Sequence, residues 1–302
     1  MQGQRASSAM EWKENARKAE ALGFDVLLMA DHFGPQLSIA PALAVAAEAT
    51  TTLRIGQLVL QNDLYHPAML AKETATLDIL SGGRMELGIG AGGSYPPDFD
   101  WTGIPFNPPG ARTERLRESL HVLKGLFAAG PLNYEGRHFK ITDYDGLPKP
   151  LQSPHPPILI GAGGPRMMEL AAKEADIIGL LPSMGATGGD YALNELSEAA
   201  LLKKVEFLRR AAPERFDQIE LNSLTQVLVV TDDRRAALQQ LSGEWEQDPD
   251  NWHESPFLLI GSVDSIADDI RRYRETLGFT YFVLRDYMMD DFAPVLAKLA
   301  GT

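Results

Sequence analysis

Short apolar runs alternate with amphipathic stretches along most of the 302-residue chain, and this alternation restricts the possible folds more than any other feature. Most of the runs are continuously apolar, which is typical of parallel strands covered by helices on both faces. The runs that predict strands are Phe24–Ala30, Leu53–Leu60, Arg84–Gly90, Pro157–Ala162, Asp176–Leu181, Leu221–Val230 and Phe279–Arg285. Repeated strand–helix units of this kind indicate a parallel sheet.

Helix signals occupy the gaps between these runs. Ser8 and Glu11 have the spacing of a capping box, and Gly23 predicts the end of the first helix. Pro67 predicts the start of another helix, which Ser81-Gly82-Gly83 would end. Further helices are expected over Arg112–Phe127, from Pro165 to Ala175, over Leu193–Ala211 and over Asp264–Leu277.

Seven strands, with room for an eighth, predict an α/β protein with a single (β/α)8 TIM-barrel domain over residues 1–302, with insertions. A doubly wound open sheet is the alternative. Because the first helix begins near Ser8, only a short polar segment remains for a first strand. We therefore predict that the first barrel strand is shortened or missing, and a full apolar-facing strand before Ser8 would contradict this.

Composition argues against several classes of protein. No apolar stretch approaches the roughly 20 residues that a membrane helix requires, and the chain has no cysteine for disulfides or thiolate metal sites. Its six histidines are scattered without metal-ligand spacing, so no metal site is predicted. The net charge of −13 argues against a nucleic-acid partner. We expect a cytoplasmic protein that binds a small molecule and neither nucleic acid nor membrane.

The string Ile-Gly-Ala-Gly-Gly ends two predicted strands, at Ile89–Gly93 and Ile160–Gly164. Glycine lets the backbone approach a flat or anionic ligand closely. Pro165 predicts a helix directly after the second copy, so free N–H groups and Arg166 would form a phosphate site there. A tight strand-to-helix turn without a ligand is the alternative. The first copy precedes a loop rich in proline and aromatic residues, which suits a planar ring but also a rigid surface loop.

Asp31 and His32 directly follow the predicted strand Phe24–Ala30. In a β/α barrel the active site lies at the C-terminal ends of the strands, so these residues are a candidate acid–base pair. The alternative is that Asp31 caps a loop and His32 is simply exposed. The chain lacks the G-x-S-x-G motif of a nucleophilic serine.

Several of these motifs together resemble the luciferase-like monooxygenase superfamily. The resemblance spans nearly the whole chain, and its best-marked segments are Leu28–Phe33, Tyr65–Glu73, Leu77–Arg84, Leu87–Gly92 and Pro156–Gly164. The nearest branch consists of oxidoreductases that depend on coenzyme F-420, a deazaflavin. The branch that uses flavin mononucleotide (FMN) is the alternative.

The resemblance implies a barrel that binds a flavin-like ring at the C-terminal ends of its strands. Carried over by motif, Asp31 would lie beside the ring and His32, the candidate catalytic residue, near its reactive carbon. A cis peptide bond is expected between Leu58 and Val59, against the ring. The residues implied to contact the ring or its ribityl chain are Gly90, Ala91 and Gly92, and those implied to hold the phosphate are Gly161, Ala162, Gly163, Gly164, Arg166 and Met167.

The implied function is hydride transfer between coenzyme F-420 and a small organic substrate. An FMN-dependent two-component monooxygenase and a non-catalytic flavin-binding protein are the alternatives. The family's sugar-phosphate dehydrogenases carry a catalytic glutamate where this chain has Gly93, so we do not expect sugar-phosphate oxidation, and His32 remains the candidate acid–base group. Dimers are common in the family, so a homodimer is expected. Aromatic residues such as Tyr95 and Trp101 suggest an apolar or aromatic substrate.

Overall fold

The structure is a computed structural model that describes residues 1–3, 5–93, 95–184, 192, 195–245 and 254–300. Its strands are β1 (Val26–Met29), β2 (Arg54–Gln57), β3 (Leu60–Gln61), β4 (Met85–Gly90), β5 (Leu132–Glu135), β6 (Lys140–Tyr144), β7 (Ile158–Ala162), β8 (Ile177–Leu180), β9 (Glu220–Leu224), β10 (Val227–Val230), β11 (Leu258–Gly261) and β12 (Phe279–Val283). Its helices are α1 (Ala9–Leu22), α2 (Ile39–Ala49), α3 (Pro67–Ser81), α4 (Pro97–Thr102), α5 (Pro109–Phe127), α6 (Pro165–Glu174), α7 (Glu198–Ala211), α8 (Arg234–Trp245), α9 (Val263–Leu277) and α10 (Met289–Leu299).

The predicted helix ends are confirmed where the sequence carried a specific signal. The backbone N–H of Glu11 donates to Ser8 Oγ at the start of α1, and Gly23 ends this helix with a φ of 92°. Pro67 occupies the first turn of α3, which ends at Gly82 with a φ of 69°. Glycine adopts this left-handed conformation without steric cost, which is why both helices stop at these positions.

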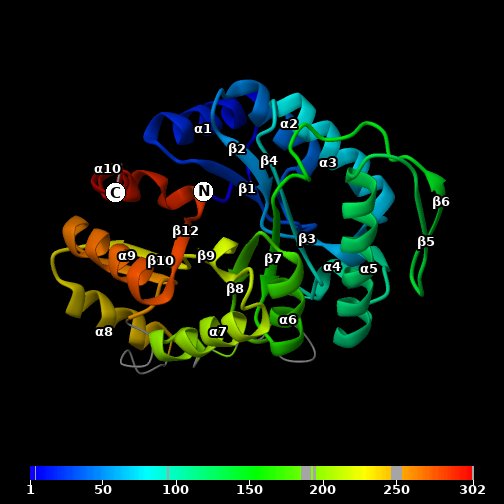
Figure 1. The fold of residues 1–302 in the computed structure, drawn as a ribbon. Coiled ribbons are helices and arrows are strands. Elements are labelled where there is room, and N and C mark those ends of the chain that lie inside the picture. The colour runs from blue at the N-terminus through cyan, green and yellow to red at the C-terminus, as the bar shows by residue number, and fades with distance from the viewer. Residues whose placement is uncertain (4, 94, 185–191, 193–194, 246–253, 301–302) are drawn as a thin grey trace.

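The parallel sheet has the strand order β1-β2-β4-β7-β8-β9-β12. The short strand β3, which follows β2 in the chain, also pairs with β4. Along this sheet the strands follow one another in the same order as in the chain. A doubly wound sheet would instead reverse its strand order at one point. Figure 1 shows the helices on the outside of this curved sheet. The predicted parallel α/β architecture is therefore confirmed, and the doubly wound alternative is excluded.

The two edge strands of the sheet meet at the N-terminus. Gln2 forms parallel bridges with Leu28 of β1 and with Arg285, which follows β12. The N–H of Gln2 donates to Leu284 O at 2.7 Å, and the N–H of Leu28 donates to Met1 O at 2.8 Å. The N-terminus accordingly lies between β1 and β12 (Figure 1).

The predicted strand Leu221–Val230 is wrong as a single element, because it divides into β9 and β10. The chain changes partners at the break: the N–H of Thr225 donates to Val283 O beside β12, whereas the N–H of Gln226 donates to Phe257 O beside β11. β10 and β11 form a separate parallel pair. Strand β11, helices α2, α4, α8 and α10, and the β5–β6 hairpin were not predicted, and the hairpin projects from the body of the protein (Figure 1).

The expected helix over Leu193–Ala211 begins later than predicted. Helix α7 starts at Glu198 because the Ser197 side chain accepts the N–H of Ala200, and residues 193 and 194 lie outside the described part of the chain. No helix formed by the described residues combines the length and apolar character needed to cross a membrane.

Candidate functional site

A cavity of about 1050 Å³ opens at the C-terminal ends of the barrel strands. It is lined by residues that follow β1, β4, β7, β8 and β12, and by residues of the N-terminal turns of α5 and α6. The predicted site residues that line it are His32, Leu58, Val59, Gly90, Ala91, Gly92, Gly161, Gly163, Gly164, Arg166 and Met167. The structure thus gathers predicted residues from four separate segments of the chain around one space.

The peptide bond between Leu58 and Val59 is cis, at the position where it was expected. The side chain of Val59 projects towards two glycines of the neighbouring strands. A Cβ atom added to Gly90 would lie 2.9 Å from Val59 Cγ2, and one added to Gly161 would lie 3.5 Å from it. The close contact at Gly90 shows that this glycine is needed for packing against Val59, independently of any ligand.

The second glycine turn leads directly into α6, with Gly164 as the N-cap residue. A Cβ atom on Gly163 would lie 2.4 Å from Pro182 O, so the backbone at Gly163 packs closely against the backbone that follows β8. Among the described residues, no atom lies within 4 Å of the corresponding Cβ position on Gly164, which leaves open space at the N-terminus of the helix. This space and the unpaired N–H groups of the first turn fit a phosphate. Ala162 is 1% exposed and does not line the cavity.

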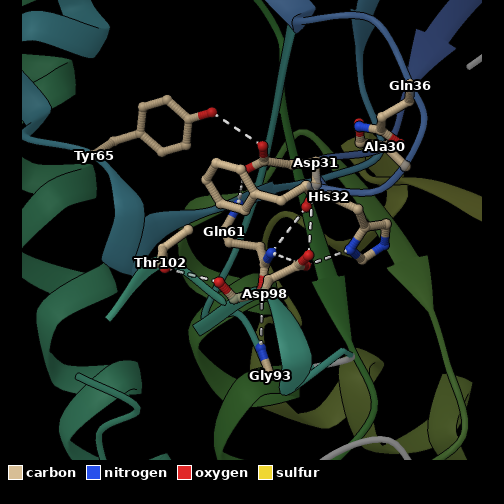
Figure 2. Close-up of polar contacts among 10 residues, drawn as sticks. Ala30, Asp31, His32, Gln36, Gln61, Tyr65, Gly93, Asp98 and Thr102 are labelled. Carbon is tan, nitrogen blue, oxygen red and sulfur yellow. Dashed lines mark hydrogen bonds and ion pairs between the residues drawn. The ribbon is translucent and has the colours of Figure 1, made fainter. Parts of the chain in front are cut away.

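His32 forms a hydrogen-bonded pair with Asp98, a residue of α4. His32 Nδ1 lies 2.7 Å from Asp98 Oδ2. The Asp98 carboxylate is fully buried, and it also accepts the Gln61 Nε2 amide at 2.8 Å and the Phe33 N–H at 2.9 Å. Figure 2 shows Gln61 and His32 meeting the same carboxylate from two sides.

This arrangement fixes the chemistry of the imidazole. A carboxylate can only accept hydrogen bonds, so Nδ1 of His32 must be the donor. In the neutral imidazole, Nε2 is then left with a free lone pair that can accept a proton from a ligand. His32 lines the cavity and its side chain is 33% exposed, so the imidazole remains accessible from the cavity.

Asp31 points away from the cavity, unlike its neighbour. Its carboxylate accepts the Gln61 N–H at 2.8 Å and the Tyr65 hydroxyl at 3.1 Å (Figure 2). Burial raises the pKa of the Asp31 carboxyl, while the Gln61 N–H and the Tyr65 hydroxyl oppose this shift. Asp31 therefore anchors β3 and the turn before α3, and the cavity wall does not include it.

The cavity carries positive charge although the protein is acidic overall. Its described lining includes Arg112, Arg166 and Arg285 but no aspartate or glutamate. Arg112 is 5% exposed and stacks 4.4 Å from the centre of the Phe106 ring, and its buried Nε has no hydrogen-bond partner among the described residues. Burial lowers the pKa of Arg112. A buried cation in this state is favourable for an anionic ligand, which would supply the missing partner.

Sequence reasoning missed Asp98, Arg112 and Arg285. Asp98 lies 66 residues after His32 in a loop and short helix that had no acid–base motif, so the sequence offered no signal for their contact. Arg285 stands at the end of the predicted strand Phe279–Arg285, and its position at a strand end was a usable signal. Gly93 lies against Arg112, because a Cβ atom at position 93 would be 2.5 Å from its Nη2.

Comparisons with known proteins identify the family of this chain. The model of the luciferase-like monooxygenase family matches residues 1–245. A putative coenzyme F-420-dependent oxidoreductase of Mycobacterium tuberculosis is 30% identical over 274 residues, which are 85% of this chain and 75% of that protein. A 5,10-methylenetetrahydromethanopterin reductase of Archaeoglobus fulgidus is 33% identical over 158 residues, or 52% of this chain. The matched region spans only about half of that reductase, at 45% of its length.

Solved structures show the same fold. An F-420-dependent secondary alcohol dehydrogenase in complex with an F-420–acetone adduct superposes with a TM-score of 0.75 at 20% identity, covering 98% of this chain and 97% of the other. A Baeyer–Villiger monooxygenase component from Pseudomonas putida in complex with FMN has a TM-score of 0.67 at 20% identity, covering 98% and 92%. The chain belongs to the luciferase-like monooxygenase family and is an enzyme of that family.

Proposed function

We propose that the protein is an oxidoreductase that transfers hydride between coenzyme F-420 and a small organic substrate. The observation that carries this proposal is the position of His32, whose imidazole is held by buried Asp98 and faces the cavity that also contains the glycine turn before α6. The curated relatives described above, which are named for F-420 or a pterin reductase activity, support the deazaflavin over FMN.

The residues present fit such a cofactor. Gly161, Gly163, Gly164 and the first turn of α6 would hold its phosphate, with Arg166 and Met167 beside them, while Gly90, Ala91 and Gly92 would contact the ring or its chain. When bound, the deazaflavin supplies the hydride acceptor and donor. His32 would exchange a proton with the substrate oxygen through Nε2, and the walls of the cavity would exclude water from that exchange.

We also infer that Gln2 is the remnant of the first strand of a closed eight-stranded barrel, because it bridges both edge strands.

We further propose a cytoplasmic homodimer. Large apolar side chains on the outer face of α3 support the dimer: Met69 is 74% exposed and Leu80 is 64% exposed.

Titration of the purified protein with coenzyme F-420 and with FMN, followed by fluorescence, tests the proposed cofactor. We expect micromolar or tighter binding of F-420 and weaker binding of FMN. Binding of FMN alone would instead support an FMN-dependent monooxygenase; two structural neighbours are monooxygenases, and one of them is in complex with FMN. Binding of neither would contradict a flavin-type function altogether.

A further inference from the structure

We propose that Arg285 binds the carboxylate of an anionic substrate and that the enzyme therefore acts on a hydroxy acid or an oxo acid. This inference rests on the proposed function for the reaction, but the anion site itself can be tested without the cofactor. It concerns the side of the cavity beside β12, away from the glycine turn.

Arg285 is held in place by two side-chain amides that also line the cavity. Its Nη1 donates to Gln2 Oε1 at 2.6 Å and its Nη2 donates to Gln226 Oε1 at 3.3 Å. Gln2 is in turn fixed, because its Nε2 donates to Leu58 O at 3.0 Å. These contacts use two of the five N–H donors of a guanidinium, which leaves the others for a ligand.

The charge of Arg285 has no counterion in the described part of the chain. Both of its side-chain partners are neutral amides, and no described carboxylate lies within ion-pair distance of it. The described residues that line the cavity also include no aspartate or glutamate, so the walls around Arg285 supply no counterion either. A positioned arginine that is oriented by neutral acceptors can bind a carboxylate with two parallel hydrogen bonds.

Arg285 and His32 lie on the same side of the cavity. Arg285 is the second residue after β12 and His32 is the third residue after β1, and the bridging residue Gln2 lies between these two strands. Neighbouring strands are about 4.8 Å apart, so the two strand ends are roughly 10 Å apart. A substrate of about three to six carbons would span from a carboxylate at Arg285 to an oxygen at His32.

The cofactor phosphate does not compete for Arg285 in this arrangement. The glycine turn follows β7, and in the sheet order β7 is separated from β12 by both β8 and β9. Arg112 and Arg166 are the cations on that side: a Cβ atom on Gly110 of α5 would lie 3.4 Å from Arg166 Nη1. The cavity therefore offers one anion site for the phosphate and a second one for the substrate.

Binding of butyrate and of its neutral isostere butyramide to the wild-type protein without cofactor tests this site by calorimetry. We expect butyrate to bind at least tenfold more tightly, because a hydrogen bond to a charged group is stronger than one between neutral groups. In Arg285→Gln the preference should fall to about twofold or less, and in Arg285→Lys it should be partly retained. Arg166→Gln is the matched control, which should keep the butyrate preference while weakening the binding of inorganic phosphate.

Equal binding of butyrate and butyramide to the wild type would overturn the proposal, as would a preference that survives in Arg285→Gln. If Arg285→Gln does not fold, a crystal structure of the wild type with butyrate decides the question, since a carboxylate bound anywhere but Arg285 contradicts it. A butyrate preference in a protein that binds neither F-420 nor FMN would leave the anion site standing and refute only the redox function.

Discussion

At the scale of single residues, the site depends on how Asp98 orients His32. The Asp98 carboxylate receives three donors within 2.9 Å, so its position is fixed before any ligand binds. Its contact with Nδ1 selects the tautomer that presents Nε2 to the cavity. In the proposed mechanism Asp98 would therefore act through His32, as a positioning residue.

We predict that Asp98→Asn lowers turnover by roughly tenfold to a thousandfold, because an amide can donate to Nδ1 and stabilise the wrong tautomer. Nitrogen NMR of the His32 ring should show a loss of the Nδ1–H tautomer, which a purely structural defect would not cause. An unchanged tautomer together with unchanged turnover would remove the role given to Asp98.

We predict that His32→Ala lowers turnover by roughly 10²–10⁴-fold while cofactor affinity changes only a few fold. This change removes the proposed acid–base group and leaves the glycine turn and the first turn of α6 intact. Steady-state kinetics and fluorescence titration separate the two effects. Turnover equal to that of the wild type would show that His32 is not the acid–base group.

The sequence was informative about site residues that occupy strand ends and poor about their partners. His32 and the two glycine turns could be predicted because a parallel barrel places the C-terminal ends of its strands together. Asp98 could not, because its contact joins α4 to a residue 66 positions earlier in the chain, and no local signal predicts such a contact. Asp31 is adjacent to His32 in sequence, yet its carboxylate accepts hydrogen bonds from Gln61 and Tyr65 and does not line the cavity.

At the scale of elements, a single carboxylate joins α1 to the segment before β2. Glu20 Oε1 accepts the backbone N–H groups of Thr51, Thr52 and Leu53 at 2.6–3.0 Å. The backbone hydrogen bonds from these residues, that of Thr52 above all, lower the pKa of Glu20 to about 2, against the opposing effect of desolvation. This carboxylate is therefore ionised in the folded protein at pH values where it would be protonated in the unfolded chain.

We predict that the stabilisation from Glu20 is fully present above the unfolded pKa of about 4.3 and is lost as the pH falls towards 2, because the folded pKa is the lower one. Glu20→Gln should lower Tm by about 2 °C at pH 7 and by less near pH 2. Thermal melts over this pH range check the trend. Glu14→Gln, at an exposed position of the same helix, is the control and should show no such dependence.

The ends of helices could be predicted from local signals in the sequence, whereas a change of pairing partner within a strand could not. The ends of α1 and α3 were predicted because glycine and proline act locally. The break between β9 and β10 was not predicted, because the apolar run continues through it and only the switch from β12 to β11 divides it. Such a switch depends on segments that are distant along the chain.

At the scale of the whole molecule, the barrel interior depends on close backbone contacts between neighbouring strands. A Cβ atom on Gly88, in the middle of β4, would lie 1.7 Å from Gln57 O at the end of β2. No adjustment of a side chain can relieve a contact with backbone. The sheet can therefore keep its curvature between β2 and β4 only with glycine at this position.

We predict that Gly88→Ala lowers the free energy of unfolding by more than about 3 kcal/mol, at or beyond the usual upper range for overpacked cores. Gly34→Ala is the control, because a Cβ there has no atom of the described residues within 4 Å, and it should change stability by less than about 1 kcal/mol. Urea denaturation of the two variants measures the difference. Similar stabilities for both variants would contradict this account of the sheet.

The central claim is that one flavin-type cofactor extends from the glycine turn of β7 to His32. A crystal structure of the protein with coenzyme F-420 tests this claim most directly. We expect the phosphate within hydrogen-bond distance of the N–H groups at the start of α6, and the ring between Val59 and His32. A cofactor bound outside this cavity, or with its phosphate away from Gly163 and Gly164, would contradict the account.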